Sequence, residues 1–125
     1  MEEKINELIK QLDSKDSKAR KEAIWLLGKL GNTKALEPLA NSLLKDENAS
    51  IRELSAKALG DLGSTEATRF LCEAIKDTSP GVQRQVVIAL GKLNDRRAVE
   101  HLEKVQEEPA IKVEVAQSLA LLGKT

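Results

Sequence analysis

The chain has 125 residues, and its 20 Lys and Arg residues balance 20 Asp and Glu residues, so the formal net charge at pH 7 is zero. This balance argues against a general affinity for nucleic acid or anionic lipid, and one Trp, one Phe and no Tyr leave few rings for stacking on bases. No segment approaches the ~20 apolar residues of a membrane span or resembles a signal peptide, and the single Cys72 suits a reducing compartment, so we expect a cytoplasmic protein.

A short motif recurs along the chain at intervals of about 30 residues. It reads Leu-Gly-x-Leu-Gly at 27–31 and 59–63, Leu-Gly-Lys-Leu-Asn at 90–94 and Leu-Ala-Leu-Leu-Gly at 119–123. A unit of this length holds two short helices and cannot bury an apolar face alone. The chain is therefore predicted to be a stack of units, each covering the next.

The segment that ends in each motif has mostly apolar residues at offsets 0, 4, 7, 8 and 11 from the first of them, as in Ala19, Ala23, Leu26, Leu27 and Leu30. This spacing is one stripe of an α-helix and excludes strands. A second apolar helix follows each motif. We call the helices that end in the motif first helices and the others second helices. The first helices are predicted at 17–30, 49–62, 80–93 and 110–122, and the second helices at 2–12, 33–45, 65–77 and 96–107.

These elements predict an all-α fold, a right-handed α-α superhelix of about eight helices in four hairpin units. The chain is read as a single domain over residues 1–125. The predicted units are 1–13 (partial), 14–46, 47–77, 78–108 and 109–125 (partial).

The residues at the predicted helix ends support this reading. Where first helices end, the sequence has residues that tolerate the left-handed backbone conformation, and good N-cap residues follow them. The residues that tolerate the left-handed conformation are Gly31, Gly63, Asn94 and Gly123, and the N-cap residues after them are Asn32, Ser64 and Asp95. Asp16, Asn48 and Ser79 are expected to cap the first helices.

Proline and glycine mark further positions. Pro80 and Pro109 are predicted at the first position of a helix, where the missing N–H costs nothing. Pro38 falls inside the predicted helix 33–45 and should kink it slightly. Glycines also recur within the first helices, which indicates that neighbouring helices approach closely there. These are Gly28, Gly60 and Gly91.

Asp46, followed by Ile51 and Arg52 and then by an Ala-rich run into the motif, resembles the HEAT-like repeat first described in phycocyanobilin lyase subunits. The resemblance covers essentially the whole chain. It implies that first helices line the convex side and second helices the concave side, and that the Arg bonds to the preceding Asp. Arg52 fits this pattern fully, and Arg20 fits with a looser loop. Gln83 and Lys112 depart from it.

Charges at matched positions of successive units alternate in sign, which predicts ion pairs between repeats rather than a charged binding groove. Each exposed pair would contribute only ~0.2 to 1 kcal/mol. The rows are Lys21, Glu53, Arg84; Lys29, Asp61, Lys92; Lys34, Glu66, Arg97; and Glu37, Arg69, Glu100.

The sequence shows no constellation of catalytic or metal-binding residues. His101 has only Cys72 as a soft companion, so no zinc-ligand spacing exists, and Cys72 is predicted to be a packed thiol. HEAT-like hydroxylases carry His-Glu pairs for a diiron site, and this chain has none. We therefore predict no enzyme activity, no cofactor and no metal.

Three sets of residues are candidates for binding a partner. Trp25, Leu54 and Ile88 are apolar residues in outward positions of first helices. Asn41, Phe70, Glu73, His101 and Lys104 lie on the predicted concave side, where half-burial between units is the alternative for Phe70 and His101. Val113 and Leu121 stand in the last helix where earlier units carry charges, which predicts a homodimer or partner contact through residues 110–122.

The functional prediction is a non-catalytic scaffold or adaptor that binds another protein and neither nucleic acid nor membrane. The alternative is an accessory subunit of a tetrapyrrole (phycobilin) lyase-type enzyme, which needs a chromophore pocket and a partner subunit. A nucleic-acid binder is a third hypothesis, and it needs a basic stripe that the sequence lacks.

Overall fold

The computed structural model describes residues 2–124, and within them the chain forms eight α-helices, three short 3-10 turns and no strand. The helices are α1 (Glu2–Gln11), α2 (Ser17–Leu30), α3 (Leu36–Lys45), α4 (Ala49–Leu62), α5 (Thr68–Ala74), α6 (Pro80–Leu93), α7 (Val99–Glu103) and α8 (Lys112–Leu121). The 3-10 turns Thr33–Ala35, Thr65–Ala67 and Arg96–Ala98 lead into α3, α5 and α7.

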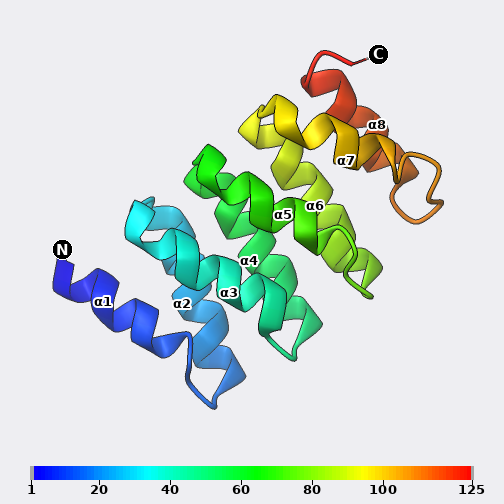
Figure 1. The fold of residues 1–125 in the computed structure, drawn as a ribbon. Helices are drawn as coiled ribbons and strands as arrows, with labels where there is room; N and C mark the ends of the chain where they lie inside the picture. Colours follow the sequence, from blue (N-terminus) through cyan, green and yellow to red (C-terminus); the bar gives the residue numbers. More distant parts are fainter. Residues whose placement is uncertain (1, 125) are drawn as a thin grey trace.

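The helices form two layers that run along the stack (Figure 1). The first helices α2, α4, α6 and α8 pack side by side in one layer, and the second helices α1, α3, α5 and α7 form the other. Each second helix packs on the first helix that follows it in the chain, as α3 does on α4. The predicted all-α superhelix is confirmed, while the exact unit boundaries remain a prediction.

The core is one continuous apolar cluster between the two layers. The leucine that precedes the first glycine of the motif is fully buried, as the helical stripe predicts; this residue is Leu27, Leu59 and Leu90 in successive units. Burying such a side chain contributes about 1.5 to 3 kcal/mol relative to leaving it exposed. Because this leucine recurs in every unit, each repeat contributes its own share of the core.

The predicted C-caps Gly31, Gly63 and Asn94 are confirmed, with φ angles of 64°, 75° and 54°. Gly123 also has the left-handed conformation, with φ at 85°, but it follows the cap residue Leu122 of α8. The side chains of Asp16 and Asn48 cap α2 and α4 by accepting hydrogen bonds from the backbone two residues on. Ser79 makes no such bond at α6. Instead, its own N–H donates to Asp77 Oδ1 at 2.9 Å.

The last three predicted second helices are too long. Residues 33–35, 65–67 and 96–98 form 3-10 turns, and α5 closes with tighter bonds such as that from Ile75 N–H to the Cys72 carbonyl. Pro38 is consequently the third residue of α3, in the first turn, where a backbone N–H has no partner inside the helix, so the predicted kink is unnecessary. Pro109 does not begin a helix either, because α8 starts only at Lys112.

The glycines inside the first helices lie at close helix contacts, as predicted. A Cβ atom built on Gly28 would lie 3.1 Å from Ala58 Cβ, and one on Gly60 would lie 3.0 Å from Ala89 Cβ. At Gly91 it would lie 2.6 Å from the Ser118 hydroxyl oxygen. The first-helix layer is therefore packed too tightly for a methyl group at these three positions without a local shift.

Candidate functional site

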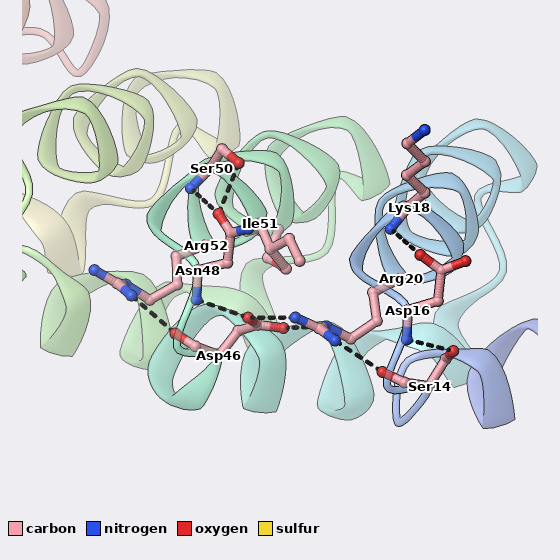
Figure 2. A network of polar contacts seen from close by, with 10 residues as sticks. Ser14, Asp16, Lys18, Arg20, Asp46, Asn48, Ser50, Ile51 and Arg52 are labelled. Carbon is pink, nitrogen blue, oxygen red and sulfur yellow. Dashed lines mark hydrogen bonds and ion pairs between the residues drawn. The ribbon is translucent and has the colours of Figure 1, made fainter.

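Arginine side chains link the loops along one edge of the stack (Figure 2). Arg20 donates from Nε to Asp46 Oδ2 at 3.0 Å and from Nη1 to the Ser14 carbonyl at 2.8 Å. Arg52 repeats this arrangement, with Nε 2.8 Å from Asp77 Oδ2 and Nη1 2.8 Å from the Asp46 carbonyl. We call this set of contacts the arginine ladder.

The predicted bond from Arg52 to the preceding Asp46 is present, but it goes to the backbone carbonyl of Asp46 and not to its carboxylate. Arg52 takes only the backbone carbonyl of the preceding loop, and its carboxylate partner comes from the following loop. The Asp46 carboxylate accepts from the Asn48 backbone N–H and faces Arg20 (Figure 2). Each Arg therefore joins two successive loops, which fixes the spacing between repeats.

The ladder weakens towards the C-terminus. Gln83 keeps only the backbone contact, donating to the Ile75 carbonyl at 2.8 Å. Lys112 instead pairs with the exposed Glu107 at 3.2 Å. The departures of Gln83 and Lys112 from the repeat pattern thus correspond to a changed loop between α7 and α8.

The second-helix layer contains a groove of about 370 Å³ between α5 and α7. It brings together the predicted residues Glu73 and His101 with Cys72, and adds side chains that the sequence reasoning did not select as site residues. These are Thr68, Arg69, Lys76 and Arg97. Helical spacing could have revealed Thr68, Arg69 and Lys76, since 68, 69, 72, 73 and 76 lie on one face of a helix, whereas Arg97 belongs to the next 3-10 turn.

A second depression of about 310 Å³ lies between α3 and α5. The half-buried Phe70 and Pro38 line it, and Arg69 borders both hollows. Asn41 and Lys104 are exposed but line neither. The five predicted residues of this layer are therefore not one site.

An ion pair organises one end of the α5–α7 groove. Arg97 Nη2 lies 2.6 Å from Asp95 Oδ2, and the same nitrogen donates to the Thr65 carbonyl at 3.2 Å. The hydrogen bond from Arg97 lowers the pKa of Asp95 to about 2. Burial, together with the Asp95 carboxylate, raises the pKa of the Cys72 thiol to about 11, which keeps this packed thiol protonated at neutral pH.

On the first-helix layer, Trp25 is 55% exposed and borders a shallow depression with the half-buried Leu54. Lys29 lies over the Trp25 ring, 5.6 Å from its centroid. Ile88 is exposed but lies outside this depression. The structure therefore brings Trp25 and Leu54 together and leaves Ile88 apart. Leu30, assigned to the buried stripe, is 40% exposed.

The alternating charge rows produce fewer ion pairs than predicted. Asp61 does pair with Lys92 across the stack at 2.9 Å, and also with Lys57 on its own helix. Lys34 also pairs across the stack, with Glu2 of α1, which lies outside the predicted row. Two other side chains take local partners instead: Arg97 pairs with Asp95, and Arg69 stacks on Phe70 with 4.4 Å between guanidinium carbon and ring centroid.

At the end of the stack, Val113 and Leu121 of α8 are 64% and 66% exposed. Among residues 2–124, no group of three or more His, Cys, Asp and Glu side chains is placed to hold a metal ion. None of the helices in this range has the length and apolar character needed to cross a membrane.

Two curated proteins are similar in sequence. The uncharacterized phycocyanin operon protein Z of Pseudanabaena tenuis is 32% identical over 97% of this chain, and deoxyhypusine hydroxylase of Danio rerio is 30% identical over 85% of it. The alignments span 64% and 35% of those two proteins. This chain therefore corresponds to only part of each relative.

Two solved structures share the fold. Human deoxyhypusine hydroxylase superposes with a TM-score of 0.85 at 23% identity, covering 98% of this chain and 44% of that one. The complex of CpcE and CpcF of phycocyanin lyase from Nostoc sp. PCC7120 also gives 0.85, at 24% identity, covering 95% of this chain and 53% of that one.

These similarities correct one prediction. The expectation that the chain is not an enzyme is contradicted, because its relatives include a hydroxylase and subunits of a lyase. The prediction rested on the lack of a catalytic motif, which is a weak criterion in a repeat protein where surfaces from several units act together. The model for HEAT repeats matches residues 5–77 and 36–121. The chain therefore belongs to the HEAT-repeat family.

Proposed function

We propose that this chain is a subunit of a phycobilin lyase-type enzyme and that it acts with a second protein chain. The observation that carries the proposal is the 32% identity with a phycocyanin operon protein over 97% of this chain. The shared fold with the CpcE–CpcF complex is consistent with it, and that structure contains two proteins. The scaffold role predicted from the sequence becomes one part of this activity.

The second-helix layer supplies what such a subunit needs. A lyase that attaches a tetrapyrrole must hold the chromophore near an acceptor protein, and the α5–α7 groove is a concave site beside a fixed guanidinium. The hydroxylase relatives suggest another chemistry. However, the only histidine of the sequence is His101, so the His-Glu pairs expected of such enzymes are missing.

The activity can be tested by reconstitution. We would combine the purified chain with a candidate partner subunit, a phycobilin and an apo-phycobiliprotein, and follow covalent attachment by fluorescence of the denatured product. The proposal expects attachment that requires both chains. Equal attachment without this chain, for every partner encoded beside its gene, would contradict it.

For the partner contact we propose the exposed face of α8. The forward faces of α2, α4 and α6 are each covered by the next first helix, whereas no described helix covers that of α8. Val113 and Leu121 are also the most exposed of the large apolar side chains in residues 2–124. Exposed apolar side chains on one helix face favour association.

The contact is tested by light scattering with and without the partner, using a Val113→Lys/Leu121→Lys double variant. We expect the variant to lose association and keep its helical circular dichroism. Trp25→Ala is the matched control, because it removes an exposed apolar group from a different face. Loss of association only in Trp25→Ala would move the contact to the outer face of α2.

A further inference from the structure

The α5–α7 groove has an unusual charge for this chain. Three cationic side chains line it, Arg69, Lys76 and Arg97, against the single acidic Glu73, although the whole sequence is neutral. Within residues 2–124, neither Arg69 nor Lys76 forms an ion pair. The groove therefore has cationic groups available for an anionic ligand.

The cations occupy the two ends of the groove. Arg69 and Arg97 belong to the starts of the neighbouring second helices, and a hydrogen bond joins Arg97 to the Thr65 carbonyl just before α5. Lys76 follows the end of α5, seven residues after Arg69, which corresponds to about two helical turns or ~10 Å. An anion at each end would be separated by roughly this distance.

The arginine end is held in place. Arg97 is fixed by Asp95 and by Thr65, and Arg69 rests on the Phe70 ring. Arg97 already directs Nε and Nη2 to Asp95, so it offers a ligand its remaining Nη1, whereas Arg69 can bind a carboxylate through paired hydrogen bonds. Beside them, the buried Thr68 hydroxyl lies close to the Asp95 carboxylate.

Between its ends, the groove has a floor with little charge. Cys72 lies there, 8% exposed, and its thiol is protonated at neutral pH because burial raises its pKa. His101 forms the wall on the α7 side. Such a floor suits the apolar body of an organic molecule better than a free inorganic ion.

We propose that the α5–α7 groove binds an organic dicarboxylate, with one carboxylate at Arg69 and Arg97 and the other at Lys76. The proposal rests on the proposed function for the ligand class, an open-chain tetrapyrrole with two propionate groups. The volume of about 370 Å³ accommodates part of such a molecule, and the open side leaves the rest to solvent or to a second chain.

The test titrates the isolated chain with biliverdin, monitored by the absorbance of the pigment. Biliverdin dimethyl ester is the matched ligand control, because it keeps the conjugated body and lacks both charges. The test variant is Arg69→Gln/Lys76→Gln, and Arg97 is left intact because it supports the turn before α7. Lys104→Gln removes a cation from the same layer outside the groove.

The proposal expects the double variant to bind biliverdin about tenfold more weakly, corresponding to ~1.4 kcal/mol. Lys104→Gln should bind biliverdin with the affinity of the wild type. The dimethyl ester lacks the charges that the two cations recognise, so its affinity for the wild type should not exceed the affinity of the double variant for biliverdin. Equal affinity of acid and ester, or of wild type and double variant, would overturn the inference.

The two proposals fail in different ways. If the reconstituted enzyme transfers chromophore and the double variant transfers it at the wild-type rate, the proposed function stands and the groove inference falls. If biliverdin binding depends on the two cations but no partner yields attachment, the groove inference stands and the proposed function falls.

Discussion

The loops of the first three repeats and the loop between α7 and α8 are built differently. In the earlier loops, Arg20 and Arg52 each join two successive turns, and the Asp46 and Asp77 carboxylates are nearly buried. The last loop has the exposed Glu107–Lys112 pair and one long, exposed hydrogen bond of 3.4 Å from Arg84 Nη1 to the Ala110 carbonyl, and α8 starts without a side-chain cap. The arginine ladder therefore fixes the stack as far as α6 and leaves α7 and α8 less constrained.

The difference shows which polar contacts matter in a short repeat protein. A nearly buried Arg–Asp pair that also satisfies a backbone carbonyl leaves unpaired groups behind when it is broken. An exposed Lys–Glu pair contributes ~0 to 1 kcal/mol, because water screens it and two long side chains must be ordered. The two kinds of loop should respond very differently to mutation.

The largest effect is expected from Arg52→Met. This change leaves the Asp77 carboxylate and the Asp46 carbonyl without their partner, and should lower the free energy of unfolding by about 2 to 4 kcal/mol. Lys112→Met is the matched control in the last loop, with an expected loss below ~0.5 kcal/mol. Urea denaturation measures both, and equal losses would remove the contrast between the loops.

Gly60→Ala tests the close packing of the regular part. The new methyl would lie 3.0 Å from Ala89 Cβ and 3.2 Å from Ala89 Cα, so backbone must move. Alanine is a better helix former than glycine by about 1 kcal/mol, and this gain offsets part of the clash. We therefore expect the free energy of unfolding, measured by thermal denaturation, to fall by a net ~1 to 2 kcal/mol. Gly31→Ala is a useful comparison, because space is open there and only the left-handed backbone is strained. A more stable Gly60→Ala would show that the helices separate easily.

Adding an Arg–Asp pair to the loop between α7 and α8 should make this loop resemble the earlier loops of the arginine ladder. Glu108 stands at the repeat position of Asp46 and Asp77, and Gln83 at that of Arg20 and Arg52. We expect Gln83→Arg/Glu108→Asp to stabilise the chain by about 0.5 to 1 kcal/mol, and by more than the sum of the single variants. A purely additive double-mutant cycle in urea denaturation would mean that the new pair does not form.

The smallest effect concerns the turn before α7. The hydrogen bond from Arg97 lowers the pKa of Asp95 to about 2 in the folded chain, below the unfolded value of ~3.9. This contribution to stability is therefore complete above about pH 4 and is lost as the pH falls through 2. The difference in Tm between the wild type and Asp95→Asn should shrink over this range. A constant difference would exclude the ionised Asp95 as its source.

Much of the fold follows from residues that act locally. The glycines and Asn94 specified the C-caps, and the stripe that includes Leu27 and Leu59 specified the buried face, because both depend on backbone geometry and period alone. Pro38 was misplaced since the sequence does not separate a 3-10 turn from the first turn of a helix. The contact of Arg52 with the Asp77 carboxylate was not predicted, because it depends on which loop lies beside α4 in space.

The candidate site was less accessible to sequence reasoning. Glu73 and His101 were chosen as separate positions on one layer, and only the packing of α5 beside α7 brings them into a groove. Arg69 and Arg97 were assigned to charge rows, since matched positions seemed to face each other. Their actual partners, Phe70 and Asp95, are neighbours in the chain, and local contacts of this kind compete well with contacts across the stack.

Hydrogen exchange of the native chain, followed helix by helix, tests most directly whether the arginine ladder marks the end of the rigid stack. We predict that amides of α4 and α6 exchange slowest, near the rate set by global unfolding, and that amides of α8 exchange much faster through local opening. In Arg52→Met this difference should shrink as α4 loses protection. Amides of α8 that are as protected as those of α6 in the isolated wild-type chain would contradict this prediction.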